Sequence, residues 1–88
     1  MDADSIRARI EHETAELRAK YPDMTRCDTA FSQRIDGGEV RHSLYLDMHW
    51  PQRQILLPGP TRPDAGAAID AAFQEARRRI DQAAWAIR

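Results

Sequence analysis

The last quarter of the chain, from Asp64 to Arg88, places the strongest constraint on the fold because it reads as one long helix with a single apolar stripe. The stretch contains no proline and is rich in alanine and arginine, which favour helix. Apolar residues recur at spacings of three and four, which predicts a helix over residues 64–87 that is capped by Asp64. The stripe consists of Ala68, Ile69, Ala72, Phe73, Ala76, Ile80, Ala83, Ala84 and Ile87. Such a helix must lie on an apolar surface, which the upstream residues have to supply.

A second helical pattern covers residues 3–21. Ile6, Ile10 and Leu17 share one side of it, and Asp2 or Asp4 is placed to cap its start. The pattern ends before Pro22, since the residue preceding a proline is pushed out of helical geometry.

Between the two helices the apolar period changes from 3.6 to 2, which predicts strands over residues 25–35, 40–50 and 54–57. The run Asp36-Gly37-Gly38-Glu39 predicts a tight hairpin turn, and a second turn begins at Pro51. The expected fold is a single domain, 1–88, of the α+β class: a two-layer sandwich of helix, three-stranded antiparallel meander and helix. Both helices are expected on one face, and the open face would carry Arg26, Asp28, Arg34, Arg41, Tyr45, Asp47 and His49.

Composition limits the class of protein. Thirteen basic and fourteen acidic residues give a net charge of −1, so only local patches could attract phosphate. No apolar run approaches the length of a membrane span, and the acidic start is unlike a signal peptide. A single cysteine, Cys27, excludes an internal disulfide framework and fits a reducing compartment. The expected location is the cytoplasm.

The residues that could carry chemistry are scattered. By strand parity His42 and His49 point to opposite faces, and His12 lies on the exposed side of the first helix. Cys27 is expected to face inward, and the sequence shows one cysteine and no clustered carboxylates. No glycine-rich loop precedes a helix. We therefore expect no enzyme, no metal site, no cofactor and no small-molecule substrate.

Three stretches, DAGAAIDAAFQEARRRID, LRAKYPDMTRC and HSLYLDMHWPQRQILLPG, give the chain a resemblance to a known family over roughly residues 6–82. The chain resembles the ribosome hibernation promoting factor family, also called the ribosome-associated inhibitor or sigma-54 modulation family. This resemblance implies a non-enzymatic RNA-binding fold, similar to double-stranded-RNA-binding domains. It also implies binding to 16S-type rRNA of the small ribosomal subunit, where the protein would block mRNA and tRNA and repress translation in stationary phase.

The chain departs from the family pattern at three places. Family members begin with a strand, whereas this sequence begins at the first helix. Ala65-Gly66 replaces a frequent hydrophobic-tyrosine pair, and Glu16 and Ala19 stand at positions that are commonly basic. These departures affect the expected ribosome binding more than the expected fold.

The candidate rRNA-binding residues are arginines. The resemblance matches the family's basic helix positions to Arg77 and Arg78, and less directly to Arg79, with Arg88 on the same outward side. The strand residues Arg26, Arg34 and Arg41 are added to this set, since arginine contacts to phosphate supply affinity without sequence information. The alternative is that the helix arginines are solvated side chains near a helix C-terminus, where the helix dipole favours cations.

Two aromatic residues and one strand edge are candidates for protein contacts. On the expected helix Trp85 lies away from the apolar stripe, and Tyr45 lies on the open sheet face, so both could contact a partner. The alternative for Trp85 is that it folds back on its own helix. Strand 25–35 is left as an open edge, which predicts a homodimer unless Arg26 and Arg34 guard that edge. The second functional interpretation is therefore a protein-interaction module without rRNA binding.

Overall fold

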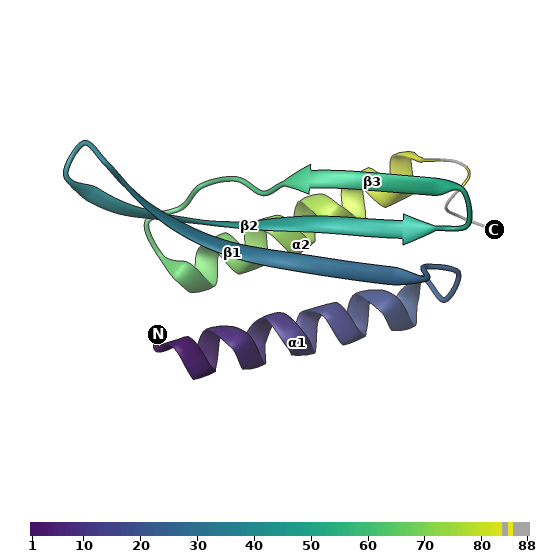
Figure 1. The fold of residues 1–88 in the computed structure, drawn as a ribbon, viewed down its shortest axis with the longest axis horizontal. Helices are drawn as coiled ribbons and strands as arrows, with labels where there is room; N and C mark the ends of the chain where they lie inside the picture. Colours follow the sequence, from purple (N-terminus) through teal and green to yellow (C-terminus); the bar gives the residue numbers. More distant parts are fainter. Residues whose placement is uncertain (84, 86–88) are drawn as a thin grey trace.

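A computed structural model describes residues 1–83 and 85 (Figure 1). The order of elements is helix, three strands and helix, as the sequence predicts, and the strands form one antiparallel sheet in the order β1-β2-β3. The fold is therefore of the α+β class. The elements are α1 (Ala3–Lys20), β1 (Arg26–Asp36), β2 (Glu39–Trp50), β3 (Arg53–Pro58) and α2 (Ala65–Gln82).

Both helices begin at aspartate caps. The Asp2 side chain accepts a hydrogen bond of 2.8 Å from the Ser5 backbone N–H, and Asp64 accepts one of 2.8 Å from Ala67. Each carboxylate satisfies an N–H that has no partner within its helix and meets the positive end of the helix dipole. Helix α1 ends before Tyr21, one residue earlier than predicted.

The prediction that the last helix continues to Ile87 is wrong, because α2 ends at Gln82. Ala83 has an extended conformation, and its N–H donates a 3.0 Å hydrogen bond to Ile80. The alanine-rich sequence would permit further helix, but the Trp85 ring lies against Trp50 of the sheet. This packing outweighs the local helix propensity.

The sheet is a long hairpin extended by a short third strand. Strands β1 and β2 pair over eleven residues, from Arg26 opposite His49 to Asp36 opposite Glu39. Gly37 and Gly38 form the turn with φ values of 61° and 83°, a geometry that glycine adopts without steric cost. The far end of the hairpin projects beyond both helices (Figure 1), and its apolar pair, Ile35 and Val40, is 77% and 49% exposed.

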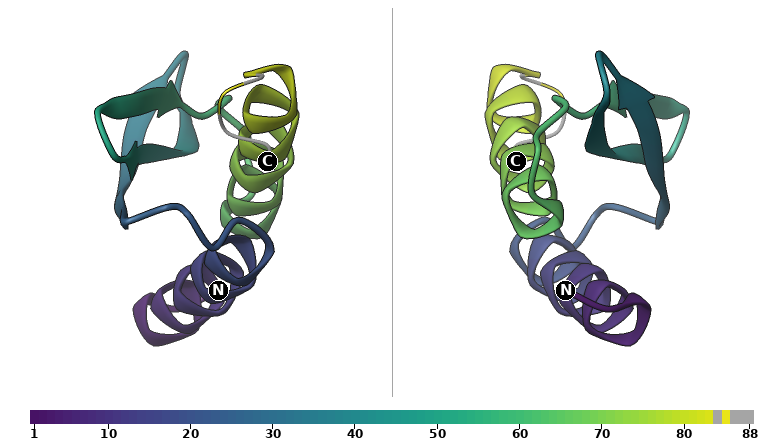
Figure 2. Two further views of the ribbon diagram at one scale, coloured as in Figure 1. Left: turned by 90° about the vertical axis from the view of Figure 1, so that its right-hand side faces the viewer. Right: turned by 90° about the vertical axis from the view of Figure 1, so that its left-hand side faces the viewer.

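The two helices do not share the sheet equally. Helix α2 faces the inner side of the sheet, whereas α1 lies beside α2 and past the β1 edge (Figure 2). Both helices lie on the same side of the sheet, as predicted, and α2 rather than α1 provides most of the contact with it. No helix or strand of residues 1–83 covers the outer face of the sheet.

The core lies between α2 and the inner face of β2 and β3, and α1 closes one side of it. Its α2 contribution follows the predicted stripe, since Ala68, Ile69, Phe73 and Ile80 have no solvent exposure. The stripe residues Ala84 and Ile87 lie outside the described residues. In the described part of the chain neither helix is long and apolar enough to cross a membrane.

Candidate nucleic-acid interface

The open face of the sheet is built from side chains that the hairpin register places in rows. Alternation along each strand puts every second residue on this face, so directly opposite residues share it. From the turn inward, the β1–β2 rows are Asp36–Glu39, Arg34–Arg41, Ser32–Ser43, Ala30–Tyr45, Asp28–Asp47 and Arg26–His49. This confirms the residues that the sequence assigns to the open face.

Arg34 and Arg41 stand directly opposite each other across the hairpin. Within residues 1–83 and 85 neither guanidinium forms an ion pair, although Asp36 and Glu39 lie one row further out. Two like charges in opposite positions repel each other. This row is therefore a place where an added anion would lower the free energy of the protein.

The rows next to the arginine pair provide hydrogen-bonding groups and an aromatic ring. The hydroxyl oxygens of Ser32 and Ser43 are 2.8 Å apart and hydrogen-bonded. Tyr45, in the following row, is 38% exposed on the same face. We define the hairpin face as Ser32, Arg34, Arg41, Ser43 and Tyr45. The two serines were missing from the sequence-based candidates, although strand parity alone could have identified them.

Arg26, at the other end of β1, is engaged by its neighbours. Its Nε lies 2.9 Å from Asp28, and its terminal nitrogen lies 3.3 Å from His49. His49 is in turn 2.9 Å from Asp47, which accepts a 2.7 Å hydrogen bond from Gln54. The Gln54 hydrogen bond and the adjacent His49 lower the pKa of the Asp47 carboxyl. The structure thus separates Arg26 from the arginine pair and places it against the Asp28 carboxylate and the His49 ring.

Two of the three arginines of α2, Arg77 and Arg78, are also paired with carboxylates. Arg77 reaches across to Glu13 of α1 at 3.6 Å. Arg78 forms a two-pronged interaction with Glu75, and the hydrogen bond lowers the pKa of that glutamate. Arg79 is half-buried, and Arg88 lies outside the described residues. A phosphate on this helix would compete with carboxylates that are already in place.

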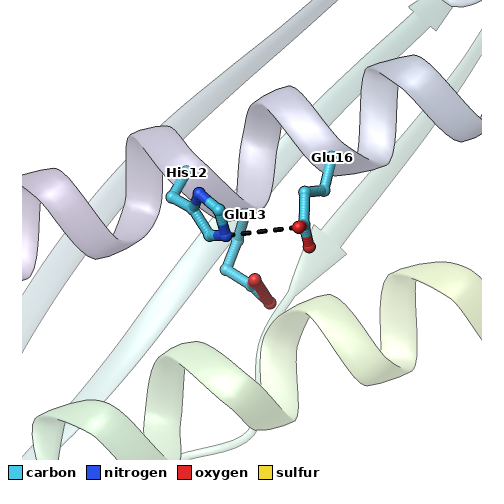
Figure 3. Close-up of side chains that lie close together, drawn as sticks. All are labelled: His12, Glu13 and Glu16. Carbon is cyan, nitrogen blue, oxygen red and sulfur yellow. Dashed lines mark ion pairs between the residues drawn. The ribbon is translucent and has the colours of Figure 1, made fainter.

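Two clusters in the described chain have the residue types of a metal site. His12, Glu13 and Glu16 lie on one side of α1, with His12 3.2 Å from Glu16 (Figure 3). Asp28, Asp47 and His49 gather across β1 and β2. The expectation that carboxylates are not clustered is therefore wrong, because cross-strand register and one helical turn bring them together. In both clusters the carboxylates already have arginine, glutamine or histidine partners. The opposite faces predicted for His42 and His49 are confirmed by the register.

Trp85 does not occupy the position predicted for it. Because α2 ends at Gln82, Trp85 is not on an exposed helical side, and its ring packs against the core beside Trp50. Its centroid also lies 5.7 Å from the Arg53 guanidinium carbon. The half-buried ring covers the end of the sheet rather than its own helix. Tyr45, the other aromatic candidate, is on the open face as predicted.

Cys27 points toward the inner side of the sheet, as predicted, and is half-buried. Burial raises the pKa of its thiol to about 11, which keeps the thiol protonated at neutral pH. A protonated thiol is a poor nucleophile.

Comparison with known proteins adds no assignment: no family model, no curated protein and no solved structure matches the chain. The candidate interface therefore depends on the geometry of the hairpin face.

Proposed function

We propose that this protein binds RNA of the small ribosomal subunit through the hairpin face and represses translation by steric occlusion in the cytoplasm, without performing chemistry. The resemblance to the hibernation factor family directs the proposal to the ribosome. The geometry of the open sheet face directs it to a particular surface.

The observation that carries the proposal is the Arg34–Arg41 row. Both guanidinium groups lack a carboxylate partner in the described chain, and each can donate two parallel hydrogen bonds to a phosphate. A phosphate between them would relieve their mutual repulsion and replace it with two attractive interactions. By contrast, Arg26, Arg77 and Arg78 already have acidic partners.

The shape of the hairpin suits an RNA target. A two-stranded ribbon that projects beyond the helices (Figure 1) can reach into a groove or a loop that a flat surface cannot enter. Single-stranded RNA bases stack on exposed aromatic rings of a sheet, and double-stranded RNA is read through phosphates and 2′-hydroxyls. Tyr45 offers a ring for the first mode, and Ser32 and Ser43 offer hydroxyls for the second.

The test is co-sedimentation with purified small subunits at about 50 and about 200 mM salt, the range over which phosphate contacts weaken strongly. Two variants remove the same charge from different surfaces: Arg34→Gln/Arg41→Gln and Arg77→Gln/Arg78→Gln. We expect the wild type to pellet at low salt. We expect the hairpin variant to bind more weakly and to reduce the slope of log affinity against log salt by about 2.

The helix variant is the matched control and should retain most of the binding. Absence of pelleting by the wild type at low salt would contradict the ribosomal proposal. Loss of binding in the helix variant, with retention in the hairpin variant, would move the interface to α2. A third pair, Tyr45→Ala and Tyr45→Phe, separates ring stacking from the hydroxyl, since stacking contributes about 1–3 kcal/mol per base.

A further inference from the structure

A groove of about 560 Å³ runs between the first half of α1 and β1. Its apolar lining comes from Ile6 and Ile10 of α1 and from Phe31 of β1. Ile6 and Phe31 are only half-buried, although both pack against the core. The groove therefore leaves apolar surface of both elements incompletely covered.

The width of the groove follows from the two layers of the fold. Helices pack with axes about 8–10 Å apart, whereas strands lie about 4.8 Å apart, so two neighbouring helices match about four strands. The sheet of the described chain has three strands, and α1 lies past β1 beside α2 (Figures 1 and 2). The sheet is therefore about one strand narrower than the layer of two helices that faces it.

The β1 edge presents unpaired backbone groups to this groove. His42 exchanges two backbone hydrogen bonds of 2.8 Å with Arg62, so its N–H and C=O point away from β1. Because these directions alternate, Ser43 points its groups toward its partner Ser32 on β1. Every second residue of β1, starting from Gln33 opposite His42, must then direct its N–H and C=O away from β2 and toward the groove. These residues include Thr29, Phe31 and Gln33.

A second copy of the chain does not fit this edge. Two copies that pair through antiparallel β1 strands are related by a two-fold axis perpendicular to the sheet. This axis places both α1 helices on the same face of the joined sheet. Each α1 lies past its own β1 edge (Figure 2), so each would enter the space of the other. A helix is about 10 Å wide, twice the spacing of the paired strands. A single extended segment avoids this overlap.

We propose that the groove binds one extended segment of a partner protein, which adds a fourth strand at β1 and covers α1. Backbone hydrogen bonds to the outward groups of β1 would supply affinity, and apolar side chains at alternate positions would contact Ile6, Ile10 and Phe31. Arg7 lines the groove and Arg34 lies on the open face of β1, and neither forms an ion pair in the described chain. Glu11 also lines the groove, one helical turn after Arg7, so a carboxylate is favoured only near the hairpin end of the segment, beside the two arginines.

The probe is a fluorescein-labelled heptapeptide of sequence Glu-Val-Thr-Val-Thr-Val-Glu, which presents alternating valines and a carboxylate in either strand direction. Fluorescence anisotropy should show saturable binding to the full chain. Amide exchange measured by NMR should show that Thr29, Phe31 and Gln33 become protected when the peptide is added. Amides that already pair with β2 should not change.

Two pairs of variants test the site. Thr29→Pro removes one outward N–H and leaves the β1–β2 ladder complete, whereas Thr29→Ala keeps that N–H. We expect Thr29→Pro to weaken peptide binding about tenfold or more and Thr29→Ala to change it little. Ile6→Glu places a charge in the groove and should also weaken binding, while Ala8→Glu on the exposed side of α1 is its control and should not. Urea denaturation verifies that each variant is folded.

Absence of binding at millimolar peptide would overturn the proposal, as would equal binding by Thr29→Pro and Thr29→Ala. Sedimentation equilibrium identifies the other occupant. A homodimer that Thr29→Pro dissociates would show that a second copy, rather than a partner segment, pairs with β1.

Discussion

The indole rings of Trp50 and Trp85 meet edge to face, with centroids 5.1 Å apart and an interplanar angle of 84°. Trp50 is the last residue of β2, and Trp85 lies three residues beyond the end of α2. The contact therefore connects the chain after the last helix to the end of the sheet. The guanidinium carbon of Arg53 lies 5.7 Å from the centroid of the Trp85 ring, so Trp85 contacts both the Trp50 ring and a cation.

We expect Trp85→Ala to lower the free energy of unfolding by about 1–3 kcal/mol, since it removes apolar burial and an aromatic pair. Urea denaturation followed by far-UV circular dichroism measures this loss. Arg53→Met keeps the side-chain length but removes the cation and should cost no more than about 1 kcal/mol. An unchanged midpoint for Trp85→Ala would show that the ring contact does not stabilise the fold.

Gly59 is required by a close approach of the loop after β3 to β2 and α2. Its N–H donates a 3.0 Å hydrogen bond to Leu44. A Cβ at this position would lie 2.9 Å from the Ala72 Cβ and still closer to the Leu44 carbonyl oxygen. We expect Gly59→Ala to destabilise the protein by about 1–3 kcal/mol in thermal or urea denaturation. Gly66→Ala is the milder comparison: its Cβ would lie 3.2 Å from the capping Asp64 Oδ2, and the gain in helix propensity opposes this crowding, so stability should change by less than about 1 kcal/mol.

Most of the fold could be predicted because the deciding interactions are local. Strand alternation assigns each hairpin residue to a face, and the Gly37-Gly38 turn fixes the register of all eleven pairs. The aspartate caps are likewise set within four residues. The Arg34–Arg41 row follows from these two facts, so its place on the open face was predictable as well.

The features that could not be predicted depend on contacts between distant segments. The end of α2 is decided by the packing of Trp85 on Trp50, which an alanine-rich helical pattern does not reveal. The pairing of Arg77 with Glu13 depends on how α1 and α2 are rotated toward each other. The groove beside β1 exists because α1 packs on α2 rather than on the sheet, and an apolar stripe does not say which surface it covers.

Thr14 carries a buried hydroxyl that forms no hydrogen bond within residues 1–83 and 85. An unsatisfied buried hydroxyl costs free energy, and valine has nearly the same shape without the polar atom. We expect Thr14→Val to raise the free energy of unfolding by about 1 kcal/mol in urea denaturation. Thr14→Ser keeps the hydroxyl and loses the methyl group, so it should lower stability. A stability decrease in Thr14→Val would indicate that the hydroxyl is satisfied in solution.

Tyr21 connects the end of α1 to α2, because its hydroxyl donates a 2.8 Å hydrogen bond to Asp81. Burial, together with this hydrogen bond and the charge of Asp81, raises the pKa of Tyr21 from its ordinary value of 10 to about 12. The folded state therefore holds the phenolic proton more tightly than the unfolded state. The stabilisation is fully present below pH 10 and is lost as the pH rises from 10 to about 12.

We expect the free energy of unfolding to fall over this pH window in the wild type and to fall less steeply in Tyr21→Phe, which keeps only the contribution of the Cys27 thiol, whose pKa is raised to about 11. Urea denaturation at a series of pH values measures it, and tyrosinate absorbance follows the titration directly. Asp81→Asn keeps a hydrogen-bond acceptor but removes the charge, so the pKa of Tyr21 should move back toward 10. Identical pH profiles for the wild type and Tyr21→Phe would exclude Tyr21 as the titrating group.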